Sequence, residues 1–367
     1  GITIKAQAVR MKYTSNAKNN YQLNLIDTPG HVDFSYEVSR SLAACEGALL
    51  VVDSTQGIQA QTMANVLLAL DNGLEIIPIV NKIDLDVADP ERISEEIQKT
   101  FGFLESEIIF ASAKDGRGID NILEAIVKRI PCPEESEDLP LQALIFDAKY
   151  DPYKGVIAYV RVYQGSLDIS SRIQIMSTKI EGDCLEIGYF NPNPTKLNKL
   201  ETGEVGYIAT GLKNITNAPV GDTITLAGNP ANKPLPGYMP LKPMVFAGFY
   251  PADGEDYLSL RDAIEKLKLN DAALSYQLET SMALGNGFRC GFLGLLHMDI
   301  VQERLEREYG INLIATSPSV AYEIELKDAS SYYIDNPAQL PELTEIQSIN
   351  EPWLNLRVLT PMSYIGG

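Results

Sequence analysis

The sequence predicts a multidomain protein of the α/β plus β class, in which an α/β domain is followed by a β-barrel and then by an α+β domain. Between Tyr21 and Ile130, β-rich apolar runs alternate with amphipathic segments. From Leu141 to about Leu226, apolar residues recur with period two, and Gly, Asn and Asp turns separate the runs. Beyond a proline-rich segment, strand and helix patterns alternate again. These patterns are typical of a parallel sheet, a small barrel and a split βαβ sandwich, in that order.

The first domain is assigned to residues 1–130. Its expected strands are the runs YQLNLID, GALLVVD, LEIIPIV and EIIFAS, and its helices begin at Asp33, at Gln59, near Pro90 and near Gly118. Because these strands are almost continuously apolar, we expect a parallel sheet that is buried on both faces. Phe34, Val38 and Leu42 have the spacing of a buried helix stripe.

The remaining boundaries follow changes in composition. Residues 131–139 are an acidic linker, residues 140–228 the barrel, and residues 229–243 a proline-rich linker. Residues 244–327 have the element order of a ferredoxin-like domain, in which Leu296, Ile300 and Leu305 can share the buried side of a helix. We expect a loop at 328–348 and, at 349–367, the start of a further ferredoxin-like domain that is cut short.

Composition argues against several classes of protein. The formal net charge of −19 disfavours non-specific binding of this stretch to nucleic acid or anionic lipid. No apolar run approaches the ~20 residues of a membrane span. The cysteines at 45, 132, 184 and 290 are far apart and show no C-x-x-C spacing, so we predict neither disulfides nor a zinc site. This use of cysteine fits a protein of the reducing cytosol. The first residues lack an initiator Met and the last stop within a strand-like run, so we expect both ends to be cuts in a longer protein.

A first polar motif, Asp27-Thr28-Pro29-Gly30-His31, follows the run YQLNLI at the carboxyl end of an expected strand. Open α/β sheets bind their ligands at such strand ends. A carboxylate at Asp27 can reach Mg²⁺ through water, and Gly30 offers a backbone N–H to a terminal phosphate. Taken alone, the same residues also suit a plain turn.

Two further motifs follow the next strand ends. After LEIIPIV come Asn81, Lys82 and Asp84, and after EIIFA come Ser112, Ala113 and Lys114. The Asp84 carboxylate can accept two hydrogen bonds from guanine, which adenine does not offer, while the lysine stem packs over the base. The Ala113 amide can bond the guanine O6 atom. Three motifs in this order, each at a strand end, favour a guanine-nucleotide site.

These motifs resemble the third, fourth and fifth nucleotide motifs of translational GTPases, and the opening GITI resembles the end of their first switch. The resemblance implies that Thr3 ligates Mg²⁺ and that His31 orients the attacking water; the alternative role of His31 is to cap the next helix. The run GFRCGFLGLLHM at 287–298, with FAGFYP before it, is similar to the LepA family of ribosome-associated elongation factors. In that run Arg289 is a candidate RNA or interdomain contact, or else packs within its domain, and Cys290 and His297 are expected core residues.

The resemblance implies a P-loop-type GTPase domain that lacks its first strand and P-loop, then the barrel, then the ferredoxin-like domain. It also implies Mg²⁺-dependent hydrolysis of GTP to GDP during protein synthesis, with the ribosome as partner, acting on stalled or mistranslocated ribosomes. The protein would be a cytoplasmic monomer, with peripheral contact to the inner face of the cell membrane implied by the family alone.

The sequence departs from the family at the phosphate site, because no G-x-x-x-x-G-K-[ST] occurs in it. Backbone N–H groups of that loop hold the β- and γ-phosphates, so we expect the chain as given to bind guanine nucleotides weakly and to be inactive. Two alternatives stay open. One is a different translational GTPase, of the elongation factor G or BipA type; the other is a non-catalytic ribosome-binding module with a defunct nucleotide site.

Overall fold

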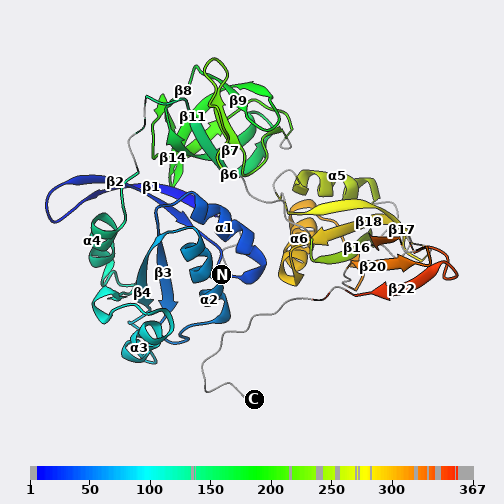
Figure 1. Cartoon of the computed structure of the whole chain (residues 1–367), viewed down its shortest axis with the longest axis horizontal. Helices are drawn as coiled ribbons and strands as arrows, with labels where there is room; N and C mark the ends of the chain where they lie inside the picture. Colours follow the sequence, from blue (N-terminus) through cyan, green and yellow to red (C-terminus); the bar gives the residue numbers. More distant parts are fainter. Residues whose placement is uncertain are drawn as a thin grey trace. The chain divides into compact units, whose positions relative to one another are not determined.

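The computed structural model describes residues 6–133, 136, 138–214, 217–236, 243–252, 257–268, 271, 273–281, 283–317, 321–328, 330–334, 340–351 and 353. Two compact units share these residues, one within Gly1–Pro240 and one within Leu241–Gly367. Figure 1 shows the first unit as an α/β domain next to an all-β domain.

The α/β domain contains two separate sheets. β1 (Gln7–Thr14) and β2 (Asn20–Asp27) form an antiparallel hairpin, while β3 (Gly47–Asp53), β4 (Glu75–Asn81) and β5 (Ile109–Phe110) form a parallel sheet. The helical segments are η1 (Val32–Phe34), α1 (Ser35–Ala43), α2 (Ala60–Asp71), α3 (Pro90–Phe101), η2 (Glu105–Glu107) and α4 (Ile119–Arg129). Asn20–Asp27, expected in the parallel sheet, pairs antiparallel with β1 among the described strands, and the sequence did not predict β1.

Local signals place the helices of this domain close to the predicted starts. The Asp89 side chain accepts a hydrogen bond from the Arg92 amide ahead of Pro90, and Gly102 ends α3 in the left-handed region with φ of +80°. Phe34, Val38 and Leu42 are all buried, as the stripe predicts. Val38 and Leu42 pack against α2 and β4. This packing fixes α1 over one face of the parallel sheet.

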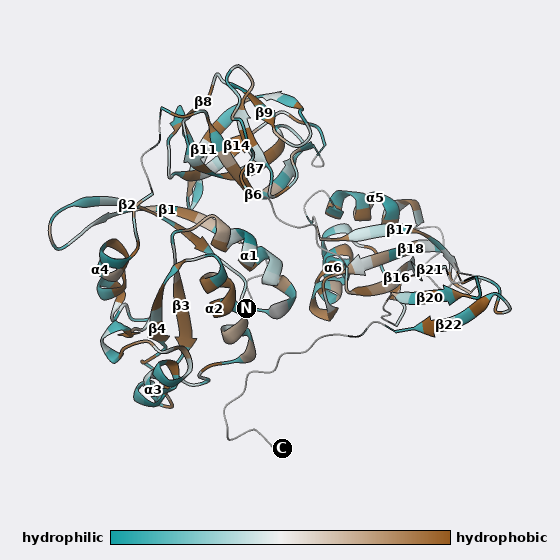
Figure 2. Cartoon of the chain, in the orientation of Figure 1, coloured by the Kyte–Doolittle hydropathy of each residue, from teal (hydrophilic) through white to brown (hydrophobic). Residues whose placement is uncertain are grey.

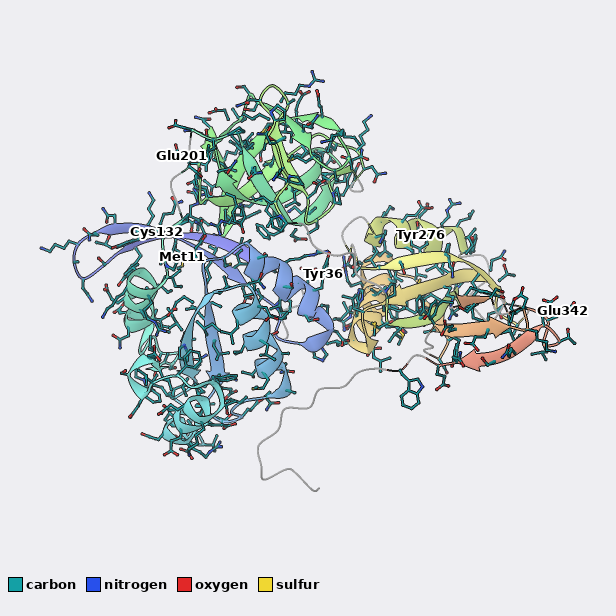
Figure 3. All side chains as sticks on the ribbon, viewed as in Figure 1. Met11, Tyr36, Cys132, Glu201, Tyr276 and Glu342 are labelled. Atoms are coloured by element: carbon teal, nitrogen blue, oxygen red, sulfur yellow. The ribbon has the colours of Figure 1, made fainter. Side chains whose placement is uncertain are left out.

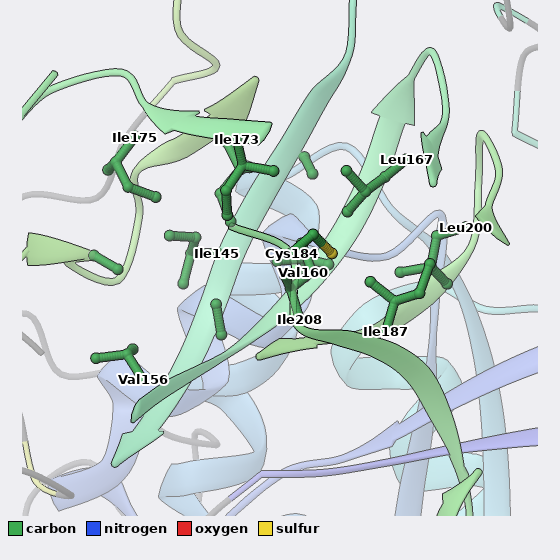
Figure 4. Packing of buried hydrophobic residues seen from close by; sticks show 14 of the residues in the cluster. Ile145, Val156, Val160, Leu167, Ile173, Ile175, Cys184, Ile187, Leu200 and Ile208 are labelled. Carbon is green, nitrogen blue, oxygen red and sulfur yellow. The ribbon is translucent and has the colours of Figure 1, made fainter. Parts of the chain in front are cut away.

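The all-β domain, here called the β domain, consists of residues 142–226. One antiparallel sheet has the order β10-β9-β15-β6-β7-β14-β11-β12, and a short pair joins β13 and β8. The strands are β6 (Gln142–Asp151), β7 (Gly155–Gln164), β8 (Leu167–Asp168), β9 (Arg172–Ile175), β10 (Glu181–Asp183), β11 (Glu186–Asn191), β12 (Asn193–Leu197), β13 (Lys199–Leu200), β14 (Val205–Ala209) and β15 (Thr223–Leu226). Period-two side chains such as Ile145, Val160 and Ile208 converge on one fully buried core (Figure 4).

The second unit begins with a βαββαβ arrangement. Its elements are β16 (Val245–Pro251), α5 (Tyr257–Lys268), β17 (Ser275–Ser281), β18 (Gly285–Phe292), α6 (Leu295–Tyr309) and β19 (Leu313–Ala315). The sheet order β17-β18-β16-β19 is that of a split βαβ sandwich. The glycine-rich run 287–292 lies in a central strand, and a Cβ at Gly287 would lie 2.4 Å from the Tyr250 ring. The packing role of this run therefore has direct support.

Two features of this unit differ from the sequence expectations. His297, Val301 and Leu305 are the buried residues of α6, whereas Leu296 and Ile300 are only half-buried. The expected loop at 328–348 contains β21 (Ser331–Ile334) and most of β22 (Ile346–Asn350), which both pair with β20 (Tyr322–Leu326). These strands are too short to show a clear period-two pattern. The expected domain at 349–367 falls almost wholly outside the described residues.

The polar residues singled out in the second unit are enclosed by their own domain. Arg289 is buried and pairs with Glu279 at 3.6 Å, so its guanidinium is not offered to RNA. His297 is buried, accepts a hydrogen bond from the Leu293 amide at Nδ1, and contacts Asp271 through Nε2 at 2.9 Å. Cys290 lies in the core, as expected, and all of the cysteines are free thiols.

No helix among the described residues is long and apolar enough to cross a membrane.

Candidate nucleotide-binding site

The carboxyl ends of β3, β4 and β5 bring polar side chains together at one edge of the parallel sheet. Asp53 and Asn81 are opposite each other in the register of β3 and β4. The Ser54 amide donates to the Asn81 carbonyl at 2.9 Å, and the Ala111 amide donates to the Val80 carbonyl at 2.8 Å. Because these bonds tie three strand ends together, the loops that follow β4 and β5 start from fixed points.

The two expected base-recognition motifs contact each other directly. Asn81 Oδ1 accepts a hydrogen bond from the Ala113 amide at 3.1 Å, and Asp84 Oδ1 accepts one from the Ser112 hydroxyl at 2.7 Å. Lys114 Nζ lies 3.7 Å from Asp84 Oδ2. The Ser112 hydrogen bond lowers the pKa of Asp84, which keeps this carboxylate an acceptor. The Ala113 amide, expected to reach guanine O6, is held by Asn81 in this structure.

Lys82 has a partner that the sequence did not predict. Its backbone lies in the left-handed region with φ of +66°, and its Nζ atom lies 2.7 Å from Asp53 Oδ2. Burial alone would raise the pKa of Asp53, but hydrogen bonds from Lys82 and Thr55 lower it overall. This ion pair fixes the lysine beside the strand ends. The available signal was the position of Asp53, which ends the apolar run GALLVVD just as Asp27 ends YQLNLID.

The motif after β2 forms a turn that leads into α1. Asp27 and Gly30 are exposed, and a Cβ at Gly30 would meet no atom within 4 Å. His31 is half-buried, and its Nδ1 atom accepts the Asp33 amide at 3.1 Å. This bond caps η1 and leaves Nε2 to carry the proton of the neutral ring. The capping role of His31 is thus present in the structure, and it leaves the other ring nitrogen available for chemistry.

A groove separates β2 from β3. Among the described strands, β2 pairs with β1 and β3 pairs with β4, and both line the same cavity of about 800 Å³ together with residues 27–30. Met11 and Cys132, labelled in Figure 3, also line it. Figure 2 shows β3 in the brown of hydrophobic residues, yet Val51 is 56% exposed. β3 is therefore only partly buried, since one of its edges has no described neighbour, whereas Val52 next to Val51 is buried.

Two polar atoms inside the groove are buried without a described hydrogen-bond partner. Asn24 Oδ1 and Ser41 Oγ are buried, line the cavity, and have no hydrogen-bond partner among the described residues. Buried polar atoms are almost always paired in folded proteins. An extended backbone could supply both the missing strand pairing and polar partners here.

The metal-ligating prediction is only partly within the described residues. Thr3 lies outside them, whereas Asp27 is an exposed carboxylate at the mouth of the groove. Mg²⁺ usually takes one or two carboxylates together with phosphate oxygens and water, so Asp27 fits such an ion without enclosing it. No group of three or more His, Cys, Asp or Glu side chains in the described part of the chain forms a metal site.

Comparison with known proteins indicates the class of protein to which the α/β domain is similar. Residues 1–132 match the Elongation factor Tu GTP binding domain, so the α/β domain is that of the GTP-binding translation factors. A crystal structure of a protein from Thermus thermophilus superposes with a TM-score of 0.69 and 19% identity, and the match covers 89% of this chain and 61% of that one. That likeness supports the multidomain fold alone.

The whole chain is similar to two sequences called Elongation factor 4. It is 57% identical to the one from Picosynechococcus sp. and 54% identical to the one from Halalkalibacterium halodurans, over 366 residues and 100% of the chain in each case. Over its whole length the chain is therefore similar to proteins of the elongation factor 4, or LepA, family. It spans 61% and 60% of the length of these relatives.

Proposed function

We propose that this protein is a GTPase of translation, which hydrolyses GTP to GDP and phosphate when the ribosome stimulates it. The observation that carries the proposal is the meeting of Asn81, Asp84 and the Ser112–Lys114 loop at the ends of parallel strands. An anionic carboxylate fixed by a serine hydroxyl suits the two adjacent N–H donors of guanine. This arrangement selects GTP over ATP.

The groove between β2 and β3 is the proposed phosphate side of this site. A parallel strand placed there would pair with the two edges that have no neighbour among the described strands, and it would end near Asp27 and Gly30. A glycine-rich loop after that strand would then present its backbone N–H groups to the phosphates. With phosphate bound, Asp27 would hold Mg²⁺ through water, and Thr3 is the proposed second ligand. When bound, the ion neutralises phosphate charge.

The ribosome is the proposed partner, and its stalled or mistranslocated states are the proposed targets. The support is similarity over the whole chain to relatives that carry the name Elongation factor 4. With a net charge of −19, RNA contacts of this chain would have to be local. We place the protein in the cytoplasm as a monomer, with peripheral membrane contact as a subsidiary proposal from the family.

Calorimetric titration with GDP tests the proposed site. The chain as given is compared with the same chain joined at its N-terminus to a strand and a loop of the G-x-x-x-x-G-K-[ST] type. We expect the extended chain to bind GDP at least ~100-fold more tightly, because the added loop contacts the phosphates, which carry most of the ligand charge. Equal affinities would contradict the assignment of the groove.

Single-turnover GTP hydrolysis separates the enzyme from the non-catalytic module. The extended chain should hydrolyse GTP slowly alone and much faster with ribosomes. GDP binding without any ribosome-stimulated hydrolysis would favour the module instead.

A further inference from the structure

Arg161 lies on β7 of the β domain, but the residues with which it forms hydrogen bonds and ion pairs, among those that the structure describes, lie in the α/β domain. Its Nη1 atom donates to the Ala44 carbonyl at 2.9 Å, and its Nη2 atom pairs with the Glu46 carboxylate. Two residues along the same strand, the Tyr163 hydroxyl donates to the Ala43 carbonyl. Arg161 is only 4% exposed, although it belongs to a domain with a complete core of its own.

These contacts hold the carboxyl end of α1. Ala43 is the last residue of this helix and Ala44 is its C-cap. The last carbonyls of a helix have no partner within it and carry partial negative charge, so a guanidinium and a hydroxyl donor stabilise them. A buried charge without its partners is costly. The position of α1 is therefore tied to the position of β7.

A second buried arginine ties β1 to the same place on the β domain. Arg10 donates to the Val205 carbonyl at 3.0 Å, pairs with Glu204 at 2.9 Å, and lies over the Tyr189 ring at 4.4 Å. Val205 and Arg161 are cross-strand partners in the register of β14 and β7. The contacts of Arg10 and Arg161 therefore lie at the same register position in the sheet of the β domain.

The candidate catalytic turn lies between the two anchored elements. β1 pairs along the whole of β2, and Gln7 lies opposite Asp27. The turn leaves β2 at Asp27, passes through His31 and enters α1 at Ser35. A nine-residue helix spans roughly 13 Å as a stiff rod, so its fixed end determines the place of the other.

We propose that Arg161 is a positioning residue for His31, acting through α1. A shift of the β domain relative to the α/β domain would move the turn and change the hydrolysis rate, so the β domain regulates this site. The inference deepens the proposed function and rests on it for its catalytic part. Its structural part, the coupling of Arg161 to the turn, can be measured without any nucleotide.

Hydrogen exchange on the 367-residue chain tests the coupling. The Asp33 and Phe34 amides report on the turn, because both donate to atoms of His31. In Arg161→Met we expect these amides, and those of α1, to exchange about tenfold faster, while the β6–β7 ladder is unchanged. Arg161→Lys should be intermediate, since lysine keeps the charge but loses the planar fork.

Two further variants keep the test decisive. Tyr163→Phe removes only the donor to Ala43 and should accelerate the same amides to a smaller extent, even if Arg161→Met proves poorly folded. Arg172→Met removes an exposed ion pair with Glu181 within the β domain and should change neither region. Unchanged Asp33 and Phe34 exchange in both Tyr163→Phe and Arg161→Lys would overturn the proposal.

Hydrolysis by the chain extended with the phosphate-binding segment tests the catalytic part. We expect Arg161→Met to lower ribosome-stimulated single-turnover hydrolysis about tenfold and to leave GTP affinity within about twofold, because only the placement of His31 changes. Equal loss of affinity and rate would indicate a merely structural role and would overturn the proposal. If the unsubstituted extended chain shows no stimulated hydrolysis, the proposed function fails, and the exchange result alone decides the coupling.

Discussion

His31 combines a structural contact with a proposed catalytic one, and two substitutions separate them. His31→Ala in the extended chain should leave GTP affinity nearly intact and slow ribosome-stimulated hydrolysis by about 10²-fold to 10⁴-fold, because the group that orients water is lost. His31→Asn can still accept the Asp33 amide, since Asn caps helices well. It should be as slow as His31→Ala. Recovery of the rate in His31→Asn would show that His31 is only a turn residue.

Asp84 is the residue on which the choice of base depends. In Asp84→Asn the side-chain oxygen can still accept the Ser112 hydroxyl, so the loop should keep its shape. The new amide NH₂ group is a donor, so it meets the guanine N–H donors unfavourably but can donate to the carbonyl that xanthine carries in place of the guanine amine. We expect GDP binding by the extended chain to weaken about 10- to 100-fold and XDP binding to improve. Competition between GDP and XDP measures this, and an unchanged preference would remove Asp84 from the base site.

Residue types and spacing were enough to single out the candidate residues that the structure brings together, but the contacts among them were not predictable. Asn81, Asp84 and Ser112 follow apolar strands, and that position is visible in the sequence. The ion pair of Lys82 with Asp53 joins residues 29 positions apart through the parallel register of β3 and β4. Such a pairing depends on which strands are neighbours, and periodicity alone does not determine that.

At the scale of elements, β11 contains a buried carboxylate that should make the β domain sensitive to acid. Burial alone would raise the pKa of Glu186, but hydrogen bonds from Lys154, Lys196 and Tyr207 lower it to about 2, from an ordinary 4.5. The folded form therefore binds the proton less tightly than the unfolded form. The resulting stability is present above pH 4.5 and is lost as the pH falls toward 2.

Glu186→Gln tests this assignment by thermal unfolding between about pH 7 and pH 3. Near neutral pH the variant should lose roughly 1 to 3 kcal/mol of unfolding free energy, because Lys154 and Lys196 lose their shared partner. It should lose less further stability on acidification than the parent does. Glu201→Gln, at an exposed site labelled in Figure 3, is the matched control and should stay within about 0.5 kcal/mol of the parent. Parallel pH curves for Glu186→Gln and the parent would exclude Glu186 as the source.

Elements with clear local signals were predicted well, and elements defined by their partners were not. The α3 cap residues Asp89, Pro90 and Gly102 all lie in the sequence that they terminate. The glycines of β18 lower its strand propensity, yet this strand pairs on both sides, with β16 and β17. The Tyr250 ring occupies the space that a side chain at Gly287 would need. Tertiary pairing therefore outweighs propensity in this strand.

At the scale of the whole chain, sequence patterns separated the α/β domain from the β domain, whereas the structure places both in one compact unit. The buried contacts of Arg10 and Arg161 explain the difference, together with Phe146, which packs against Ala44 and Val205. The composition of the acidic linker gave no sign of this interface, because the residues that form it lie outside the linker.

The long reach of these contacts has a consequence for synthesis of the chain. Arg10 and Val205 are 195 residues apart, and Ala44 and Arg161 are 117 apart. At ~5–20 residues per second, a ribosome makes Val205 roughly 10 to 40 s after Arg10. During that interval the β1–β2 hairpin and α1 exist without the surface that holds them. On the proposed coupling through α1, the turn around His31 therefore takes its final position only after the β domain has emerged and folded.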